Sequence, residues 1–70
     1  MAIVSYEKLR VLMVQRRLQF KDLRVIFGFS PKTIKKLRED KSVNLSILLE
    51  LCSFFECDIG DIMQVKIVKL

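Results

Sequence analysis

The stretch GFSPKTIKKL, residues 28–37, brings together four basic or hydroxyl side chains: Lys32, Thr33, Lys35 and Lys36. If this stretch forms a short helix, only Ile34 and Leu37 are left to anchor it to a core. Ammonium and hydroxyl groups on one exposed helix bind phosphates through charge and hydrogen bonds. The chemistry that this cluster predicts is therefore the binding of a polyanion.

No other group of residues predicts catalysis or metal binding. Asp58 and Asp61 are spaced like paired carboxylates, but acids at the start of a helix usually cap it and complement its dipole. Cys52 and Cys57 lie five residues apart in a chain without His, so no zinc pattern is available and we expect two buried thiols. The chain has no Gly-rich phosphate loop and no nucleophile with an evident base. We expect no enzymatic activity, no cofactor and no metal.

Length and charge indicate a small basic domain. We expect the 70 residues, 51% of them apolar, to form one domain with a compact core, because no Gly-, Ser- or Pro-rich linker indicates a second. Residues 1–43 carry eleven basic and four acidic side chains, a net charge of +7, whereas residues 44–70 have a net charge of −2. The basic half therefore holds the candidate polyanion-binding face. Without an apolar run of about 20 residues or a signal peptide, we expect a cytoplasmic protein that contacts no membrane.

Two helices joined by a short turn are predicted at about residues 20–38. The first covers about residues 20–27 and ends at Gly28, where the chain often needs a positive φ that Gly tolerates. Ser30 then caps the second helix, and Pro31 takes its first position, where the missing N–H costs no hydrogen bond. Five apolar side chains are expected to face inward across this pair: Leu23, Ile26, Phe27, Ile34 and Leu37.

Three further helices flank this pair, so the predicted fold class is all-α with five helices. The first begins at a Ser5 cap and fades near Leu18. The fourth begins after Asn44 and runs to about Phe55, and Asp58 caps a last helical turn.

The two ends of the chain have a different pattern. The segments AIV and VKIVKL are β-branched, and the second partly alternates between apolar and charged residues. The termini are therefore candidates for a small two-stranded ribbon. Two short strands are marginal alone and need support from a helix face.

The fourth helix carries two apolar rows. The row expected to face inward consists of Leu45, Leu48, Leu49, Cys52 and Phe55. The other row is Ile47, Leu51 and Phe54, and so small a domain hardly buries both. Either the terminal ribbon or a second subunit covers the second row. We expect a homodimer that uses it.

The order of these features resembles the phage-repressor and Cro-type helix-turn-helix regulators. The similarity is greatest to a compact bacterial subgroup and rests on the motifs SYEKLRVLM, DLRVIFGFSPKTIKKL and LLELCSFFECDIGDIM. It covers roughly residues 4–64. The resemblance implies a five-helix domain whose third helix, about residues 31–38, lies in the major groove of double-stranded DNA.

The resemblance also implies which residues contact DNA. Base-facing positions fall on Pro31, Lys32, Thr33 and Lys36. Phosphate-facing positions fall on Arg16, Arg17, Gln19, Phe20, Lys21, Lys35, Arg38 and Lys41.

Two residues depart from the family pattern. Phe20 stands where many relatives carry a polar residue, and Arg24 stands where a small residue is preferred at the helix crossing.

The sequence thus predicts a DNA-binding transcriptional regulator, and we expect a repressor that occludes a promoter. One alternative is a protein-interaction module, antitoxin-like or accessory, that uses the row of Ile47, Leu51 and Phe54. Another is a binder of single strands or RNA, but Phe20 is the sole aromatic candidate for base stacking in the basic region. No small-molecule substrate is evident.

Overall fold

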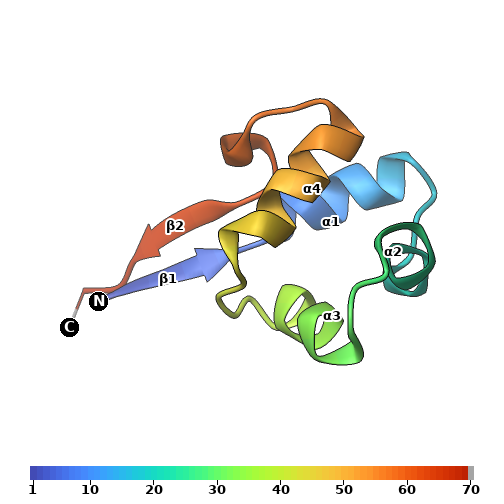
Figure 1. The fold of residues 1–70 in the computed structure, drawn as a ribbon. Coiled ribbons are helices and arrows are strands. Elements are labelled where there is room, and N and C mark those ends of the chain that lie inside the picture. Colours follow the sequence, from blue (N-terminus) through green and yellow to red (C-terminus); the bar gives the residue numbers. More distant parts are fainter. Residues whose placement is uncertain (70) are drawn as a thin grey trace.

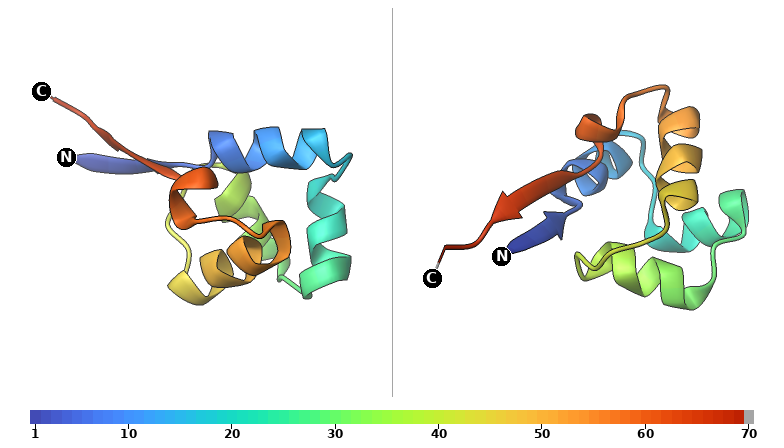
Figure 2. Two further views of the ribbon diagram at one scale, coloured as in Figure 1. Left: turned by 90° about the horizontal axis from the view of Figure 1, so that it is seen from above. Right: turned by 60° about the vertical axis from the view of Figure 1, so that its left-hand side comes forward.

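The computed structural model describes residues 1–69, which form four α-helices, one 3-10 turn and a two-stranded sheet (Figure 1). In chain order the elements are β1 (Ala2–Ser5), α1 (Glu7–Gln15), α2 (Phe20–Phe27), α3 (Pro31–Arg38), α4 (Leu45–Phe55), the 3-10 turn η1 (Ile59–Asp61) and β2 (Gln64–Ile67). The helices pack together, and the ribbon of β1 and β2 projects from them (Figure 2). None of the helices in residues 1–69 is long and apolar enough to cross a membrane.

The prediction of five helices is wrong, because the fifth is only the 3-10 turn η1. Its start is closed by reciprocal hydrogen bonds: Asp58 Oδ1 accepts from the Ile59 amide at 2.8 Å, and Asp61 Oδ2 accepts from the Asp58 amide at 3.0 Å. Asp58 is therefore the predicted cap. The turn stays short because the chain must enter β2 three residues later.

The predicted pairing of the two termini is confirmed. Strands β1 and β2 are antiparallel, with Ala2 opposite Ile67 and Ser5 opposite Gln64. Ser5 is the last residue of a strand, and Tyr6 takes the cap position that we predicted for Ser5, although Ser5 Oγ still accepts from the Glu7 amide at 3.4 Å. Helix α1 begins after Tyr6, whose amide donates to Asp40 Oδ1 at 2.8 Å.

Helix α1 also ends earlier than predicted. Its last residue is Gln15, and Arg17 adopts a left-handed conformation with φ of 56°. The Leu18 amide then donates to the carbonyl of Met13 at 2.8 Å, which closes the helix end.

The core takes side chains from all four α-helices and from the segments between them. Its buried apolar members are Tyr6, Leu9, Met13, Leu23, Phe29, Ile34, Leu37, Leu48, Leu51, Phe55 and Ile62. Of the inward residues predicted for α2, Leu23 is buried and Phe27 is half-buried, but Ile26 is 43% exposed. Cys52 and Cys57 are free and only half-buried, so the prediction of buried thiols holds in part. Partial burial raises the pKa of the Cys57 thiol.

The predicted inward row of α4 is correct for Leu48 and Phe55 and wrong for Leu45 and Leu49. Leu48, Leu51 and Phe55 are buried, whereas Leu45 and Leu49 are 60% and 59% exposed. Phe54 meets the ring of Phe27 on α2 edge to face, with ring centroids 5.2 Å apart. Phe54 also contacts Phe55 in the same geometry at 5.1 Å.

The orientation of α4 also affects the row of Ile47, Leu51 and Phe54, which we predicted to contact a second subunit. Leu51 lies fully within the core, so the expectation that it contacts a second subunit is wrong. Ile47 is half-buried against the core, and Phe54 is 37% exposed beside Phe27. Intramolecular packing therefore covers much of this row.

Candidate nucleic-acid interface

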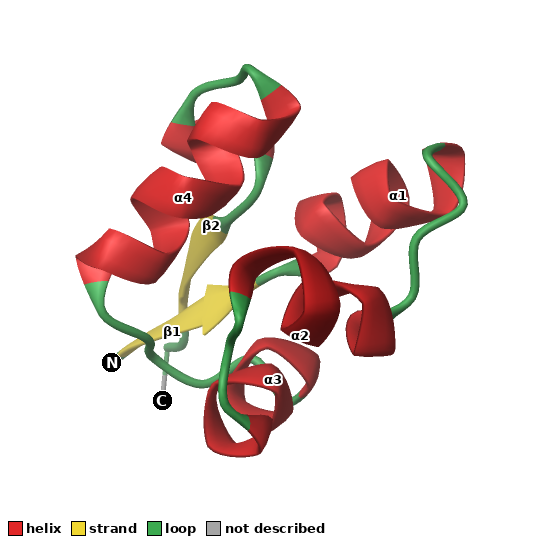
Figure 3. Cartoon of the chain, turned by 45° about the vertical axis from the view of Figure 1, so that its right-hand side comes forward, coloured by secondary structure: helices red, strands yellow, loops and turns green. Residues whose placement is uncertain are grey.

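Helices α2 and α3 are adjacent and joined by a three-residue turn, with α3 on the outside of the molecule (Figure 3). Gly28 ends α2 with φ of 73°, and its amide donates to the Arg24 carbonyl at 2.9 Å. A Cβ at Gly28 would meet no atom within 4 Å. The left-handed backbone, rather than a lack of space, is therefore the reason for glycine here.

Ser30 caps α3 as predicted. Its Oγ accepts from the Thr33 amide at 3.2 Å and donates to Thr33 Oγ1 at the same distance. Pro31 occupies the first helical position. Because its hydroxyl oxygen already accepts from Ser30 and it is half-buried, Thr33 belongs more to the cap than to the exposed surface.

The outer surface of α3 is cationic. Ile34 and Leu37 are buried and anchor the helix, as predicted. The exposed residues of α3 are Pro31, Lys32, Lys35 and Arg38, and Lys36 is half-buried. The lysine side chains therefore share the solvent side of a helix that only two core residues hold in place.

The end of α3 is tied to the start of α1. Asp40 follows α3 in a left-handed conformation with φ of 58°, and the Lys41 amide donates to the Lys36 carbonyl at 2.9 Å. The Asp40 carboxylate accepts from Arg10 Nη1 at 3.0 Å and from the Tyr6 amide at 2.8 Å. These two donors, Arg10 first, hold the pKa of Asp40 below its ordinary value.

Tyr6 supplies a second tie to the same place. Its hydroxyl donates to the Lys41 carbonyl at 2.8 Å, and burial raises the pKa of this phenol. The segment after α3 is thus fixed at its backbone while the side chain of Lys41 remains exposed.

The start of α2 lies beside α3. Asp22 Oδ2 accepts from the Gln19 amide at 2.7 Å, which orders the first turn of α2. Gln19 and Lys21 are exposed, whereas Phe20 is half-buried and packs against the core. The guanidinium carbon of Arg38 lies 5.3 Å from the centroid of the Phe20 ring.

A groove between α2 and α3 gathers four cationic side chains. It is lined by Lys21, Arg24, Pro31, Ile34, Lys35, Arg38 and Glu39. Sequence reasoning did not include Arg24 among the site residues. The signal was present, because Arg24 follows Lys21 by three residues and so shares its helix face.

Arg16 lies elsewhere. Its Nη2 donates to the Phe55 carbonyl at 3.4 Å, and its guanidinium carbon is 5.2 Å from the Phe55 ring centroid. The C-terminal end of α4 and helix α3 are at opposite edges of the molecule in Figure 1. In the free protein Arg16 therefore closes the end of α4, and its predicted contact with a phosphate stays a prediction. Arg17 is exposed in the turn between α1 and α2.

The comparisons with known proteins agree with this geometry. The family model of the Cro/C1-type HTH DNA-binding domain matches residues 8–66. The chain belongs to this family. The crystal structure of the transcriptional regulator VanUg superposes with a TM-score of 0.87 at 37% sequence identity, covering 93% of this chain and 87% of that chain. Comparison with proteins of curated function finds no significant match.

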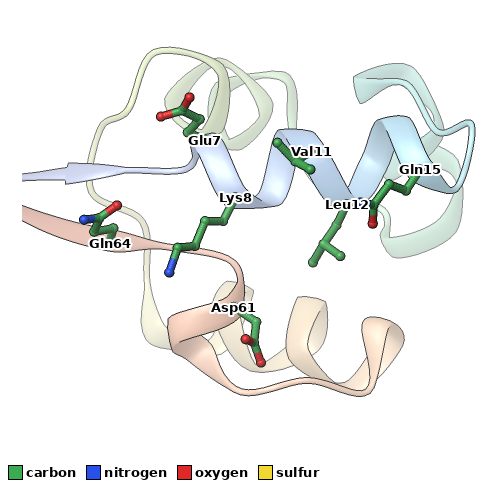
Figure 4. Close-up of a pocket in the computed structure, with 7 residues that line it drawn as sticks. All are labelled: Glu7, Lys8, Val11, Leu12, Gln15, Asp61 and Gln64. Carbon is green, nitrogen blue, oxygen red and sulfur yellow. The ribbon is translucent and has the colours of Figure 1, made fainter.

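A second hollow lies between α1 and the segment from η1 to β2 (Figure 4). It is lined by Glu7, Lys8, Val11, Leu12, Gln15, Asp61 and Gln64. Lys8 Nζ donates to the Gly60 carbonyl at 3.0 Å and so links α1 to η1. The hollow mixes charges of both signs, and residues 1–69 hold no group of three metal-ligating side chains. The α2 and α3 surface is therefore the candidate site.

Proposed function

We propose that this Cro/C1-type domain binds double-stranded DNA sequence-specifically and regulates transcription, with α3 in the major groove. The observation that carries the proposal is the outer surface of α3, where Lys32 and Lys35 are exposed on a helix anchored by Ile34 and Leu37. The major groove of B-DNA, about 12 Å wide, admits one helix of this size. The VanUg structure, described as that of a transcriptional regulator, supports the same role.

The proposed contacts divide into two kinds. Pro31, Lys32 and Lys36 face base edges, where lysine donates to O6 or N7 of guanine. Thr33 reaches the bases only with the hydroxyl proton that its cap bonds leave free. The phosphate contacts come from Arg17, Gln19, Lys21, Lys35, Arg38 and Lys41. Because phosphate contacts carry no sequence information, the few base-facing residues set specificity.

We further propose that the protein is a homodimer and represses by occluding a promoter. Paired half-sites about 34 Å apart are the usual arrangement for helix-turn-helix dimers. Phe54 and Ile47 retain some exposed surface for a subunit contact, and Leu45 and Leu49 add a second exposed apolar pair on α4. The mass in solution, with and without DNA, distinguishes a dimer from a monomer.

The same exposed leucines support the alternative of a protein-interaction module. Leu45 and Leu49 lie one helical turn apart and are both more than half exposed. A partner protein would bind them and lose affinity with Leu49→Ala, while duplex binding stayed absent or unchanged.

The decisive experiment is a binding titration on a randomised duplex pool at two salt concentrations. Lys32→Ala and Lys36→Ala should change which sequences are selected. Arg38→Ala and Lys41→Ala should weaken every duplex alike and reduce the salt slope by about 0.9 for each phosphate that is no longer neutralised. Lys66→Ala on β2 is the matched control for charge and should have a smaller effect. Equal losses on all sequences for the α3 variants and for Lys66→Ala would reject the proposed site.

A further inference from the structure

The contact between Arg38 and Phe20 joins the last residue of α3 to the first residue of α2. The guanidinium carbon lies 5.3 Å from the ring centroid, within the range of a cation–π contact. Within residues 1–69, the Arg38 guanidinium makes no hydrogen bond and no ion pair. The ring is therefore the group that fixes this side chain in the free protein.

The surroundings of Arg38 make such a support necessary. Lys21, Arg24 and Lys35 line the same groove, and these like charges repel its guanidinium. Glu39 is the one acidic residue that lines the groove, and it forms no ion pair with Arg38. The negative face of an aromatic ring offsets this repulsion without using the N–H donors of the guanidinium.

The Phe20 ring is itself held in place by packing. Phe20 is half-buried and packs against the core, and it lies within the turn that the hydrogen bond between Gln19 and Asp22 orders. A long, exposed Arg side chain has many rotamers to lose when it binds, whereas a guanidinium held over a fixed ring has lost part of that freedom already. The contact with the ring uses none of the five N–H donors in a hydrogen bond, so they remain available to a phosphate.

We propose that Phe20 is a positioning residue for DNA binding, which holds the Arg38 guanidinium ready for a backbone phosphate. This inference rests on the proposed function of the α2 and α3 surface. It gives Phe20 a role although the side chain has no polar atom to offer DNA.

The test is a double-mutant cycle on one selected duplex with wild type, Phe20→Leu, Arg38→Ala and the double variant. Leucine keeps an apolar side chain against the core but has no π face. We expect Phe20→Leu to weaken binding by about two- to fivefold, the range of an exposed cation–π contact. In the Arg38→Ala background the same change should have no effect, and Phe20→Tyr should retain wild-type affinity. An equal loss in both backgrounds, or no loss in wild type, would overturn the proposal.

A second measurement needs no DNA and keeps the proposal testable if a variant folds poorly. In the NMR spectrum of the wild-type free protein, the ring should shift the Arg38 side-chain protons upfield of those of Arg24. Phe20→Tyr should keep this shift, and wild-type Arg38 resonances at the values of an unstacked arginine would contradict the contact. If the wild type binds no duplex at all, the proposed function fails as well. If it binds and the cycle is additive, only the role of Phe20 fails.

Discussion

Helices α3 and α4 are held in place by different means. Helix α3 has eight residues and two buried side chains, and its ends are fixed by the Ser30 cap and by Asp40. Helix α4 has eleven residues and three buried side chains, but Asn44 makes no side-chain cap hydrogen bond. Helix α3 is therefore held mainly by its ends, and helix α4 mainly by its packing. This difference leaves most of the surface of α3 free for a ligand.

The different ways in which α3 and α4 are held have an energetic consequence. Residues that face outward on α3 contribute little to the core, so they can be charged and clustered without loss of the fold. Residues of α4 that reach the core cannot be changed in this way. Stability and DNA binding are therefore expected to respond to different substitutions.

The largest effect is expected for Leu51→Ala in α4. Leu51 is fully buried, so the removal of its packing and the resulting cavity should lower the free energy of unfolding by about 2–5 kcal/mol. Leu49→Ala is the matched control, and because that side chain is more than half exposed the loss should stay below about 1 kcal/mol. Urea denaturation of both variants provides the measurement. Equal losses would show that the observed face of α4 is incorrect.

Ser30→Ala is expected to have the next largest effect. It removes the oxygen that accepts from the Thr33 amide, which should lower the free energy of unfolding by about 1 kcal/mol. Asn44→Ala removes the residue at the same position of α4, where no side-chain hydrogen bond exists, and should cost less than about 0.5 kcal/mol. Thermal unfolding of the two variants provides the measurement. If Asn44→Ala proved the more costly change, α4 would depend on its cap after all.

A smaller, pH-dependent effect is expected for Asp40. Because Arg10 and the Tyr6 amide lower its folded-state pKa, its contribution is present above the unfolded pKa of about 3.9 and is lost as the pH falls through the folded value. Asp40→Asn should lower the free energy of unfolding at pH 7 by about 0.2–1 kcal/mol, as for a surface ion pair.

The measurement is the free energy of unfolding of wild type and Asp40→Asn between about pH 7 and pH 2. The difference between them should shrink as the solution is acidified below about pH 4. Arg10→Ala should remove much of the same pH dependence, because Arg10 is the main cause of the shift. A difference that grows on acidification would contradict the assignment.

The smallest effect on stability is expected for Lys32→Ala. The side chain is exposed, so the change in the free energy of unfolding should stay within about 0.5 kcal/mol. Thermal unfolding of this variant, compared with Ser30→Ala two residues earlier, provides the measurement. A loss as large as that of Ser30→Ala would show that α3 does not separate its cap from its binding surface.

The helix-turn-helix was predictable because local chemistry fixes it. Gly28 is needed for the left-handed backbone, and Ser30 and Pro31 mark the start of α3, so the bounds of both helices followed from the sequence. The two anchors, Ile34 and Leu37, stand among charged residues and leave one choice of buried face.

The face of α4 was not predictable in the same way. Its apolar residues extend almost around the helix, so their spacing allows more than one face toward the core. The face is chosen by tertiary packing, which buries Leu51 in the core and brings Phe54 against Phe27, on a helix far away in the chain. The start of α1 at Tyr6 was not predictable either, because the Tyr6 amide donates to Asp40, which lies just after α3.

The positions of the site residues were also only partly predictable from the sequence. The exposure of Lys32 and Lys35 followed from helical periodicity, whereas the place of Arg16 on Phe55 and of Arg38 on Phe20 depends on which helices meet. Long cationic side chains reach several positions from one backbone site. Sequence position alone therefore does not say which of them faces a phosphate.

The most direct test of α3 as the DNA-binding surface is an NMR titration of the protein with a selected duplex, in which backbone amide shifts are followed residue by residue. The largest changes should fall on residues 19–21 and 32–41, at the start of α2 and along α3, while the ribbon of β1 and β2 is little affected. Changes concentrated on the ribbon or on Leu45 and Leu49, with α3 unperturbed, would contradict this assignment.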